Sequence, residues 1–144
     1  MSTRINIQQV EPAAYKAMFA LEGYLQTSQL SKTHKDLIKI KASLINGCAY
    51  CINMHTQEAR KHGETDQRIY LLSAWRETTL YTEEERALLA LTEEVTLIQN
   101  HVSEETYKTA ERLFGANYLS HIIMAIVTIN AWNRIAITTE LPLE

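Results

Sequence analysis

The stretch Asn46-Gly47-Cys48-Ala49-Tyr50-Cys51-Ile52-Asn53-Met54-His55 separates two predicted helices and carries the most informative chemistry in the chain. Before it, apolar residues recur at three- and four-residue steps, which predicts a helix that is capped by Ser31 and interrupted at Asn46-Gly47. After it, a helix over about 48–62 is predicted to stop at Gly63, because glycine readily adopts the left-handed conformation that ends helices. The sequence therefore predicts a helix pair folded about Gly47.

Helical patterns also cover the rest of the chain, with predicted helices over 12–27, 65–75, 82–98, 103–115 and 117–137. The last of these is apolar over much of its circumference, which is typical of a helix that is central to a fold or covered by another subunit. The chain of 144 residues holds only 4 Gly and 2 Pro, too few for many hairpins. We therefore expect an all-α, single-domain bundle (1–144) of six or seven helices, with the cysteine pair at the start of the third.

Composition and charge exclude several classes of protein. Hydrophobic residues make up 46% of the chain, and 14 basic against 17 acidic residues leave a net charge of -3 without a basic block, which argues against nucleic acid as a partner. The apolar run Ile122–Ile129 is far shorter than the ~18 residues of a membrane span, and the first residues lack a secretory apolar stretch. We expect a cytoplasmic protein whose cysteines are redox-active or metal-bound rather than a static disulfide.

Two acidic runs, Glu83-Glu84-Glu85 and Glu93-Glu94, have a structural interpretation. Thr82 and Glu85 form a capping-box pattern, and the first run complements the positive end of a helix. Both runs are expected on a solvated face and are given no function.

The cysteines and His55 are predicted to share one face of their helix. At 100° per residue, Cys51 lies about 60° and His55 about 20° from Cys48 around the axis. The start of a helix presents unpaired N–H groups and a positive dipole end, so we expect the thiol pKa to be lowered there. Histidine is a common proton carrier in active sites, so His55 is expected to accept and return a proton. This arrangement supplies a nucleophile, a resolving thiol and a proton carrier.

A carboxylate is expected next to His55. If the two helices fold back antiparallel about Gly47, residue 39 lies opposite His55 and residue 36 opposite Glu58, so Asp36 comes within about a turn of the imidazole. Asp36 could then orient the ring and fix its tautomer. Glu58, three residues after His55 on the same helix, is a competing partner, and the sequence leaves both open.

Two-cysteine motifs also serve in haem attachment, in thioredoxin-like folds and in zinc binding. Haem attachment needs His directly after the second cysteine, where Ile52 stands, and a thioredoxin-like fold needs a sheet that the sequence does not predict. A zinc site would need a fourth ligand besides Cys48, Cys51 and His55, drawn from Asp36, His34 or His62. Metal binding, and a structural oligomer whose cysteines only pack in the core, thus stay open beside redox catalysis.

Three segments together resemble the alkyl hydroperoxidase D-like (AhpD-like) proteins of the carboxymuconolactone decarboxylase superfamily: Lys35-Asp36-Leu37-Ile38, Asn46 to Cys51, and His55-Thr56. Residues Ile129 to Arg134 are a looser echo of the same family. The resemblance implies an all-helical fold that assembles as a trimer or hexamer, and a thiol-dependent peroxidase or disulfide-reductase activity. It implies a small hydroperoxide as substrate, an external dithiol protein as reductant, and no bound cofactor, metal or membrane.

Residue by residue, the resemblance gives Cys51 the role of peroxide-attacking thiol and Cys48 that of resolving thiol. His55 matches the family's histidine, and Asp36 stands where the family commonly has Glu. Tyr50 occupies the place of a second histidine found in some members. Arg134 is expected to pair with an acid or to lie at a subunit boundary, and only the looser echo suggests that it approaches the thiols.

A homo-oligomer is also expected on physical grounds. A monomer that exposed the apolar residues of the last helix would carry a hydrophobic patch, formed by Ile122, Ile123, Ile126, Val127 and Trp132.

Overall fold

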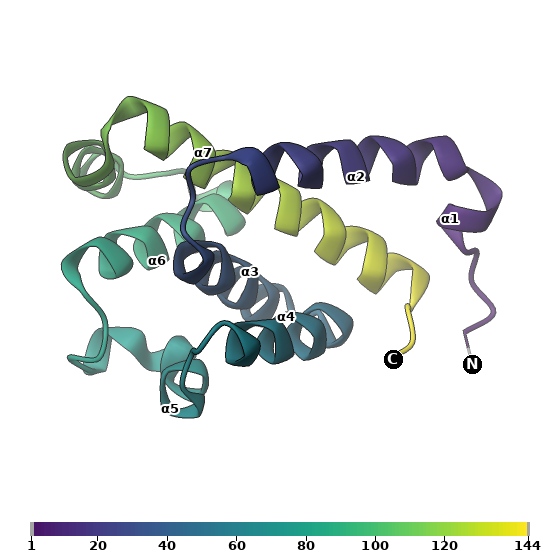
Figure 1. Ribbon diagram of the computed structural model, residues 1–144, viewed down its shortest axis with the longest axis horizontal. Coiled ribbons are helices and arrows are strands. Elements are labelled where there is room, and N and C mark those ends of the chain that lie inside the picture. The colour runs from purple at the N-terminus through teal and green to yellow at the C-terminus, as the bar shows by residue number, and fades with distance from the viewer. Residues whose placement is uncertain (1, 144) are drawn as a thin grey trace.

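The computed structural model describes residues 2–143, which form seven α-helices and two 3₁₀ segments with no strand. Their bounds are α1 (Ile7–Val10), α2 (Pro12–Thr27), α3 (Lys32–Asn46), α4 (Ala49–Lys61), α5 (Asp66–Tyr70), η1 (Leu71–Glu77), α6 (Glu83–Thr96), η2 (Ile98–Asn100) and α7 (Glu104–Thr139). The predicted all-α fold is confirmed (Figure 1).

Local capping chemistry determines where most helices begin. The side chains of Ser31, Thr65, Thr82 and Ser103 each accept a hydrogen bond from the backbone N–H three residues further on, which satisfies a donor that the helix leaves free. These four starts are the predicted ones. The short helix α1, capped by the Asn6 side chain, was not predicted.

Glycine ends or bends helices where the backbone becomes left-handed. Gly47 has φ 70° and closes α3, as predicted. Gly115 has φ 76° and is the one non-helical residue inside α7, so the two predicted helices 103–115 and 117–137 form a single element with a kink.

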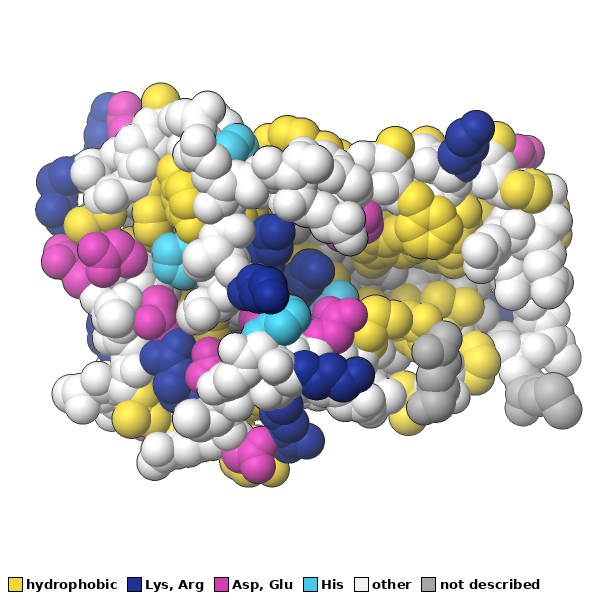
Figure 2. Space-filling view, in the orientation of Figure 1, with side chains coloured by type: hydrophobic (Ala, Val, Ile, Leu, Met, Phe, Trp, Pro, Cys, Tyr) yellow, Lys and Arg dark blue, Asp and Glu magenta, His cyan; other side chains and the backbone are white. Residues whose placement is uncertain are grey.

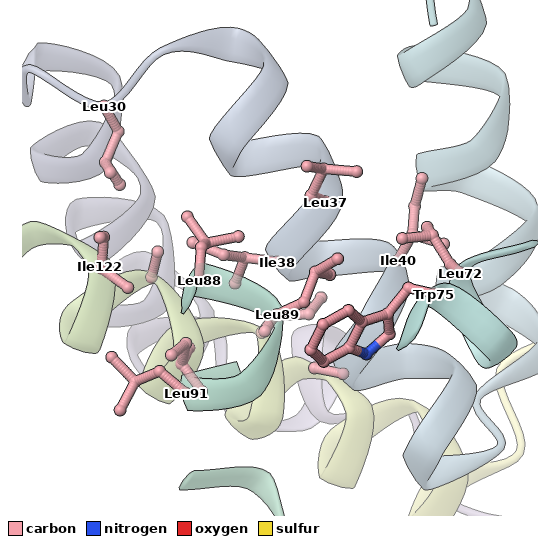
Figure 3. Packing of buried hydrophobic residues seen from close by; sticks show 14 of the residues in the cluster. Leu30, Leu37, Ile38, Ile40, Leu72, Trp75, Leu88, Leu89, Leu91 and Ile122 are labelled. Carbon is pink, nitrogen blue, oxygen red and sulfur yellow. The ribbon is translucent and has the colours of Figure 1, made fainter. Parts of the chain in front are cut away.

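Helix α3 is the centre of the fold and packs against α4, α6 and α7. Its Leu37, Ile38 and Ile40 have no exposed surface. Figure 3 shows them among leucines of α6, Ile122 of α7 and residues of η1. Helix α2 lies along the C-terminal half of α7, on the far side of that helix from α6 (Figure 1). Because α3 is central, its packing fixes the positions of α4 and α7, which carry residues of the site described below.

The expectation that both acidic runs lie on a solvated face is wrong for two carboxylates. Glu85 is 8% exposed and accepts a hydrogen bond from Arg68. Glu93 accepts from the Trp75 ring at 2.9 Å and lies 3.2 Å from the buried Lys41 ammonium. A buried cation needs a counter-charge, and these glutamates tie α6 to α3, α5 and η1.

The apolar stripe of α7 is mostly covered by the chain itself. Ile122 and Ile126 are fully buried in the core, so the expectation that they would form an exposed patch is wrong, whereas Val127 is 44% exposed. By length and composition α7 could cross a membrane; it packs against α3 and α6, and 33% of its most apolar window is buried. The more exposed apolar side chains include Val10 at 68% and Phe19 at 53%, next to and within α2.

Candidate active site

The cysteine pair lies where α4 begins. Cys48 is the N-cap residue, and its sulfur accepts a hydrogen bond from the Cys51 backbone N–H at 3.3 Å. Its own N–H donates to the carbonyl of Ser43 at 3.0 Å, across the turn made by Gly47. Both thiols are free, and Cys48 and Cys51 are only 1% and 3% exposed. The helix start thus holds the pair out of bulk water.

A cavity of about 600 Å³ adjoins Cys51. Of the two cysteines, it is Cys51 that lines the cavity, together with residues of α4, α2, α3 and α7: Met54, His55, Glu58, Tyr15, Phe19, Glu22, Gln26, Lys39, Trp132 and Ala136. In Figure 2 a hollow lined by hydrophobic side chains lies below α2, and histidine, acidic and basic side chains gather at one end of it. A small molecule in this cavity lies against Cys51.

The wall opposite α4 is aromatic. The Trp132 ring lies 5.4 Å from that of Tyr15 and 5.8 Å from that of Phe19. Its indole N–H donates to Glu22 at 2.9 Å, which fixes the ring's orientation and occupies that carboxylate. The cavity therefore has an apolar side and a polar end around Cys51 and His55.

Glu58 is the carboxylate that orients His55. The Nδ1 atom of His55 lies 3.0 Å from Glu58 Oε2, and this hydrogen bond is the main reason that the pKa of Glu58 is lowered. An ionised Glu58 can only accept, so Nδ1 carries the proton that it donates. Nε2 is then the nitrogen free to take a proton.

Asp36 does not contact His55 in the way the sequence predicted. It accepts a hydrogen bond from Nδ1 of His62 at 2.7 Å, because His62, the C-cap residue of α4, lies beside Asp36 of α3. Burial raises the pKa of Asp36, although His62 and Lys39 oppose the shift. Of the two alternatives that the sequence left open, the contact with His55 belongs to Glu58.

The expected lowering of the thiol pKa is wrong for Cys51. Burial, followed by the neighbouring Cys48 sulfur, raises the pKa of the Cys51 thiol to about 12. The physical reason is that burial excludes the water that would stabilise a charged thiolate. A hydrogen bond from the Asn133 side chain acts in the opposite direction.

Asn133 is a site residue that the sequence reasoning did not single out. It is fully buried on α7, donates to Ser43 Oγ at 3.0 Å and accepts from Asn46 at 2.9 Å. The available signal was an amide inside the apolar Ile129–Arg134 stretch, where a buried polar side chain needs partners. Arg134 itself is exposed and donates to the carbonyl of Asn130 at 3.1 Å, not to an acid.

The residues offered as a fourth zinc ligand have other partners. His34 lies 2.6 Å from the Tyr118 hydroxyl, and His62 and Asp36 bind each other. Within residues 2–143, no three His, Cys, Asp or Glu side chains cluster closely enough to hold a metal ion. The geometry thus gives the zinc alternative no support.

Comparison with known proteins identifies the class. Residues 12–94 match the model of the carboxymuconolactone decarboxylase family, and the chain belongs to that family. Its fold is AhpD-like: an Agrobacterium tumefaciens protein of unknown function, whose description suggests an AhpD-type antioxidant defence protein, shares 43% identity at a TM-score of 0.95. That match covers 99% of this chain and 98% of the other.

Two further proteins are similar to this chain. The uncharacterized protein YdfG of Bacillus subtilis (strain 168) is 43% identical over 138 residues, which is 95% of this chain and 94% of YdfG. A peroxidase-related protein with an alkylhydroperoxidase AhpD core, from Ralstonia eutropha JMP134, has a TM-score of 0.82 at 18% identity over 95% of this chain and 74% of that one. At that identity the likeness concerns the fold alone.

Proposed function

We propose that the protein is a thiol-dependent peroxidase and disulfide reductase, in which the Cys48–Cys51 pair reduces hydroperoxides and His55 carries protons. The observation that carries the proposal is that Cys51 and His55 line the same cavity, with His55 held through Nδ1 by Glu58. Cys51 as the nucleophile, His55 as the base and Glu58 as the group that orients the base then all line one cavity.

Catalysis would begin with proton transfer from the Cys51 thiol to Nε2 of His55. The high pKa of this thiol makes such a base necessary at neutral pH. The thiolate attacks the distal oxygen of the hydroperoxide, the O–O bond breaks, and the leaving alkoxide takes the proton back from His55. The products are an alcohol and a sulfenic acid on Cys51.

Cys48 would resolve this intermediate. Its sulfur attacks the Cys51 sulfenic acid, a disulfide forms and water leaves. The proximity follows from the N-cap geometry, in which the Cys48 sulfur already contacts the N–H of Cys51. An external dithiol protein then supplies the two electrons that restore both thiols.

Asp36 is proposed to act on His55 indirectly, through His62 and Glu58. It holds His62, whose charge is one of the influences that lower the pKa of Glu58. Asp36 thereby supports the carboxylate that orients His55 without touching the ring itself.

The setting of the protein is also part of the proposal. We propose a cytoplasmic location, where dithiol reductants keep the cysteines reduced. We propose a homo-oligomer, a trimer or a hexamer, with the exposed apolar side chains Val10 and Phe19 as candidates for burial between subunits.

Peroxide turnover with an added dithiol tests the function. Cys51→Ser is expected to abolish turnover. The matched variant Cys48→Ser is expected to accumulate a sulfenic acid on Cys51 during a single turnover, which dimedone labelling and mass spectrometry detect. A Cys51→Ser protein as active as the wild type would refute the proposal, and so would native thiols that never form an internal disulfide on oxidation.

A further inference from the structure

Side chains of α2 divide the cavity beside Cys51 into an aromatic part and a polar part. Tyr15, Phe19, Glu22 and Gln26 follow one another at three- and four-residue steps, so they share one face of α2, and all four line the cavity. From the first to the last of them the helix rises about 16 Å. The cavity thus follows α2 from an aromatic end to a polar end.

The reactive groups lie along the same direction. Helix α4 runs in the same direction as α2 (Figure 1), and its residues in the cavity wall pass from Cys51 through His55 to Glu58. Cys51 therefore belongs to the aromatic part and Glu58 to the polar end. Figure 2 agrees, since charged and histidine side chains gather at one end of the hollow.

Lys39 is a half-buried cation at this polar end, which it lines from α3. Its ammonium group is close enough to Glu58 to help lower the pKa of that carboxyl, and it opposes the rise in the pKa of Asp36. These carboxylates are nevertheless paired with His55 and His62, and Lys39 forms no ion pair or hydrogen bond within residues 2–143. The ammonium is thus available to an anion in the cavity.

The acidic side chains in the described part of the cavity wall are already occupied. Glu58 holds Nδ1 of His55 at 3.0 Å, and Glu22 accepts from the indole N–H of Trp132 at 2.9 Å. Gln26 is exposed, and its side-chain amide has no hydrogen-bond partner in the part of the chain that the structure describes. Lys39 and Gln26 therefore offer donors without acceptors, an arrangement complementary to a carboxylate.

We propose that the cavity takes an organic hydroperoxide that carries a carboxylate, with Lys39 and Gln26 binding the carboxylate and the rest of the molecule lying between the aromatic wall and Cys51. The proposal deepens the proposed function, on which it rests, by naming the class of substrate. An apolar body covers aromatic surface that would otherwise face water, and the carboxylate pairs with an ammonium group that water screens only in part. A neutral hydroperoxide uses the first of these interactions and not the second.

Two peroxides of the same shape test the class of substrate: 4-(2-hydroperoxypropan-2-yl)benzoate and its uncharged methyl ester. The measurement is the second-order rate constant with which each oxidises the reduced protein. In the wild type we expect the carboxylate to react about fivefold faster than the ester, as for one ion pair with a half-buried lysine. Equal rate constants would overturn the proposal.

Lys39→Met removes the charge and keeps an unbranched side chain. We expect the ratio of the two rate constants to fall to about one in this variant, and Lys39→Arg, which keeps the charge, to retain the preference. The matched control is Lys61→Met, because Lys61 is exposed in the last turn of α4 and lies outside the cavity wall. It should leave the ratio unchanged.

The ratio is the readout because the loss of Lys39 also changes the surroundings of Glu58, and this change acts on both peroxides alike. A folded Lys39→Met protein, checked by circular dichroism, that keeps the wild-type ratio would overturn the proposal, since Lys39 would then only balance the charges of Asp36 and Glu58. The wild-type ratio tests the proposal even if this variant does not fold.

Binding of molecules that are not peroxides separates this proposal from the proposed function. Isothermal titration calorimetry with 4-isopropylbenzoate and its methyl ester measures the preference for a carboxylate without a redox step. A preference of about fivefold that Lys39→Met abolishes, together with no turnover of either hydroperoxide, would refute the peroxidase and retain the carboxylate site. Turnover of both hydroperoxides at equal rates, with equal affinity for the benzoate and its ester, would retain the peroxidase and refute the carboxylate site.

Discussion

Replacing Glu58 with glutamine separates the two carboxylates that compete for the role of orienting His55. The glutamine side chain would have the same length, and its oxygen could still accept from Nδ1 of His55, so the tautomer is retained. What is lost is the negative charge that stabilises the protonated imidazole. The perturbation thus removes one electrostatic interaction and little else.

The size of the effect follows from the geometry. The two groups are 3.0 Å apart, and the side chain of His55 is 11% exposed but that of Glu58 is 42% exposed. A hydrogen bond between charged groups contributes about 1.5–3 kcal/mol when buried, and water screening at Glu58 reduces this to about 1 kcal/mol. A barrier raised by about 1 kcal/mol slows the reaction about fivefold.

The assay is the second-order rate constant for oxidation of the reduced protein by hydroperoxide in a stopped-flow instrument. Asp36→Asn is the comparison variant, because its partner is His62 at 2.7 Å rather than His55. We expect it to slow the rate less than Glu58→Gln does, because Asp36 acts on Glu58 only through His62. A larger loss for Asp36→Asn than for Glu58→Gln would refute the assignment of Glu58 as the orienting group, and imidazole ¹⁵N shifts would report the tautomer directly.

Four other outcomes are expected. Because the pKa of Cys51 is raised to about 12, its alkylation rate in the wild type should climb about tenfold per pH unit from pH 7 to 10; a plateau below pH 9 would contradict this. Phe19→Ala should raise KM about fivefold for cumene hydroperoxide and leave hydrogen peroxide kinetics unchanged, since only an organic substituent uses the aromatic wall, and equal effects on both peroxides would count against that wall. Glu93→Leu should lower the free energy of unfolding by about 3 kcal/mol, because Lys41, whose side chain is 6% exposed, loses its counter-charge, whereas the exposed control Glu84→Gln should change little in urea denaturation. The pKa of Asp36 is raised on folding, so this group stabilises the wild type fully below its unfolded pKa and less as pH rises through the folded pKa. Asp36→Asn should therefore gain stability relative to the wild type as pH rises above the unfolded value of 3.8, and a difference that stays constant with pH would disprove this.

The helix starts could be predicted from the sequence because capping is local. Ser31, Thr65, Thr82 and Ser103 each bond to a backbone group three residues away, and no distant part of the chain is needed to place them. The same holds for Cys48, Cys51 and His55, which one helix carries within two turns.

The parts of the site that could not be predicted depend on contacts between helices. Asp36 pairs with His62 instead of His55 because the offset of α3 against α4 is set by the turn at Gly47 and by packing, which periodicity does not report. Asn133 reaches its partners from a helix that is 87 residues away from Asn46 in the sequence. The raised pKa of Cys51 has the same origin, since burial of the helix start depends on α7 and not on the motif itself.

The sulfur that caps α4 is also the one proposed to close the disulfide, and this ties the integrity of a helix end to the oxidation state. When Cys48 bonds to Cys51, the acceptor of the Cys51 amide becomes a disulfide sulfur instead of a thiol. That amide is one of the donors that a helix start leaves without an intrahelical partner. Its exchange rate is therefore expected to differ between the reduced and the oxidised pair and would report the oxidation state.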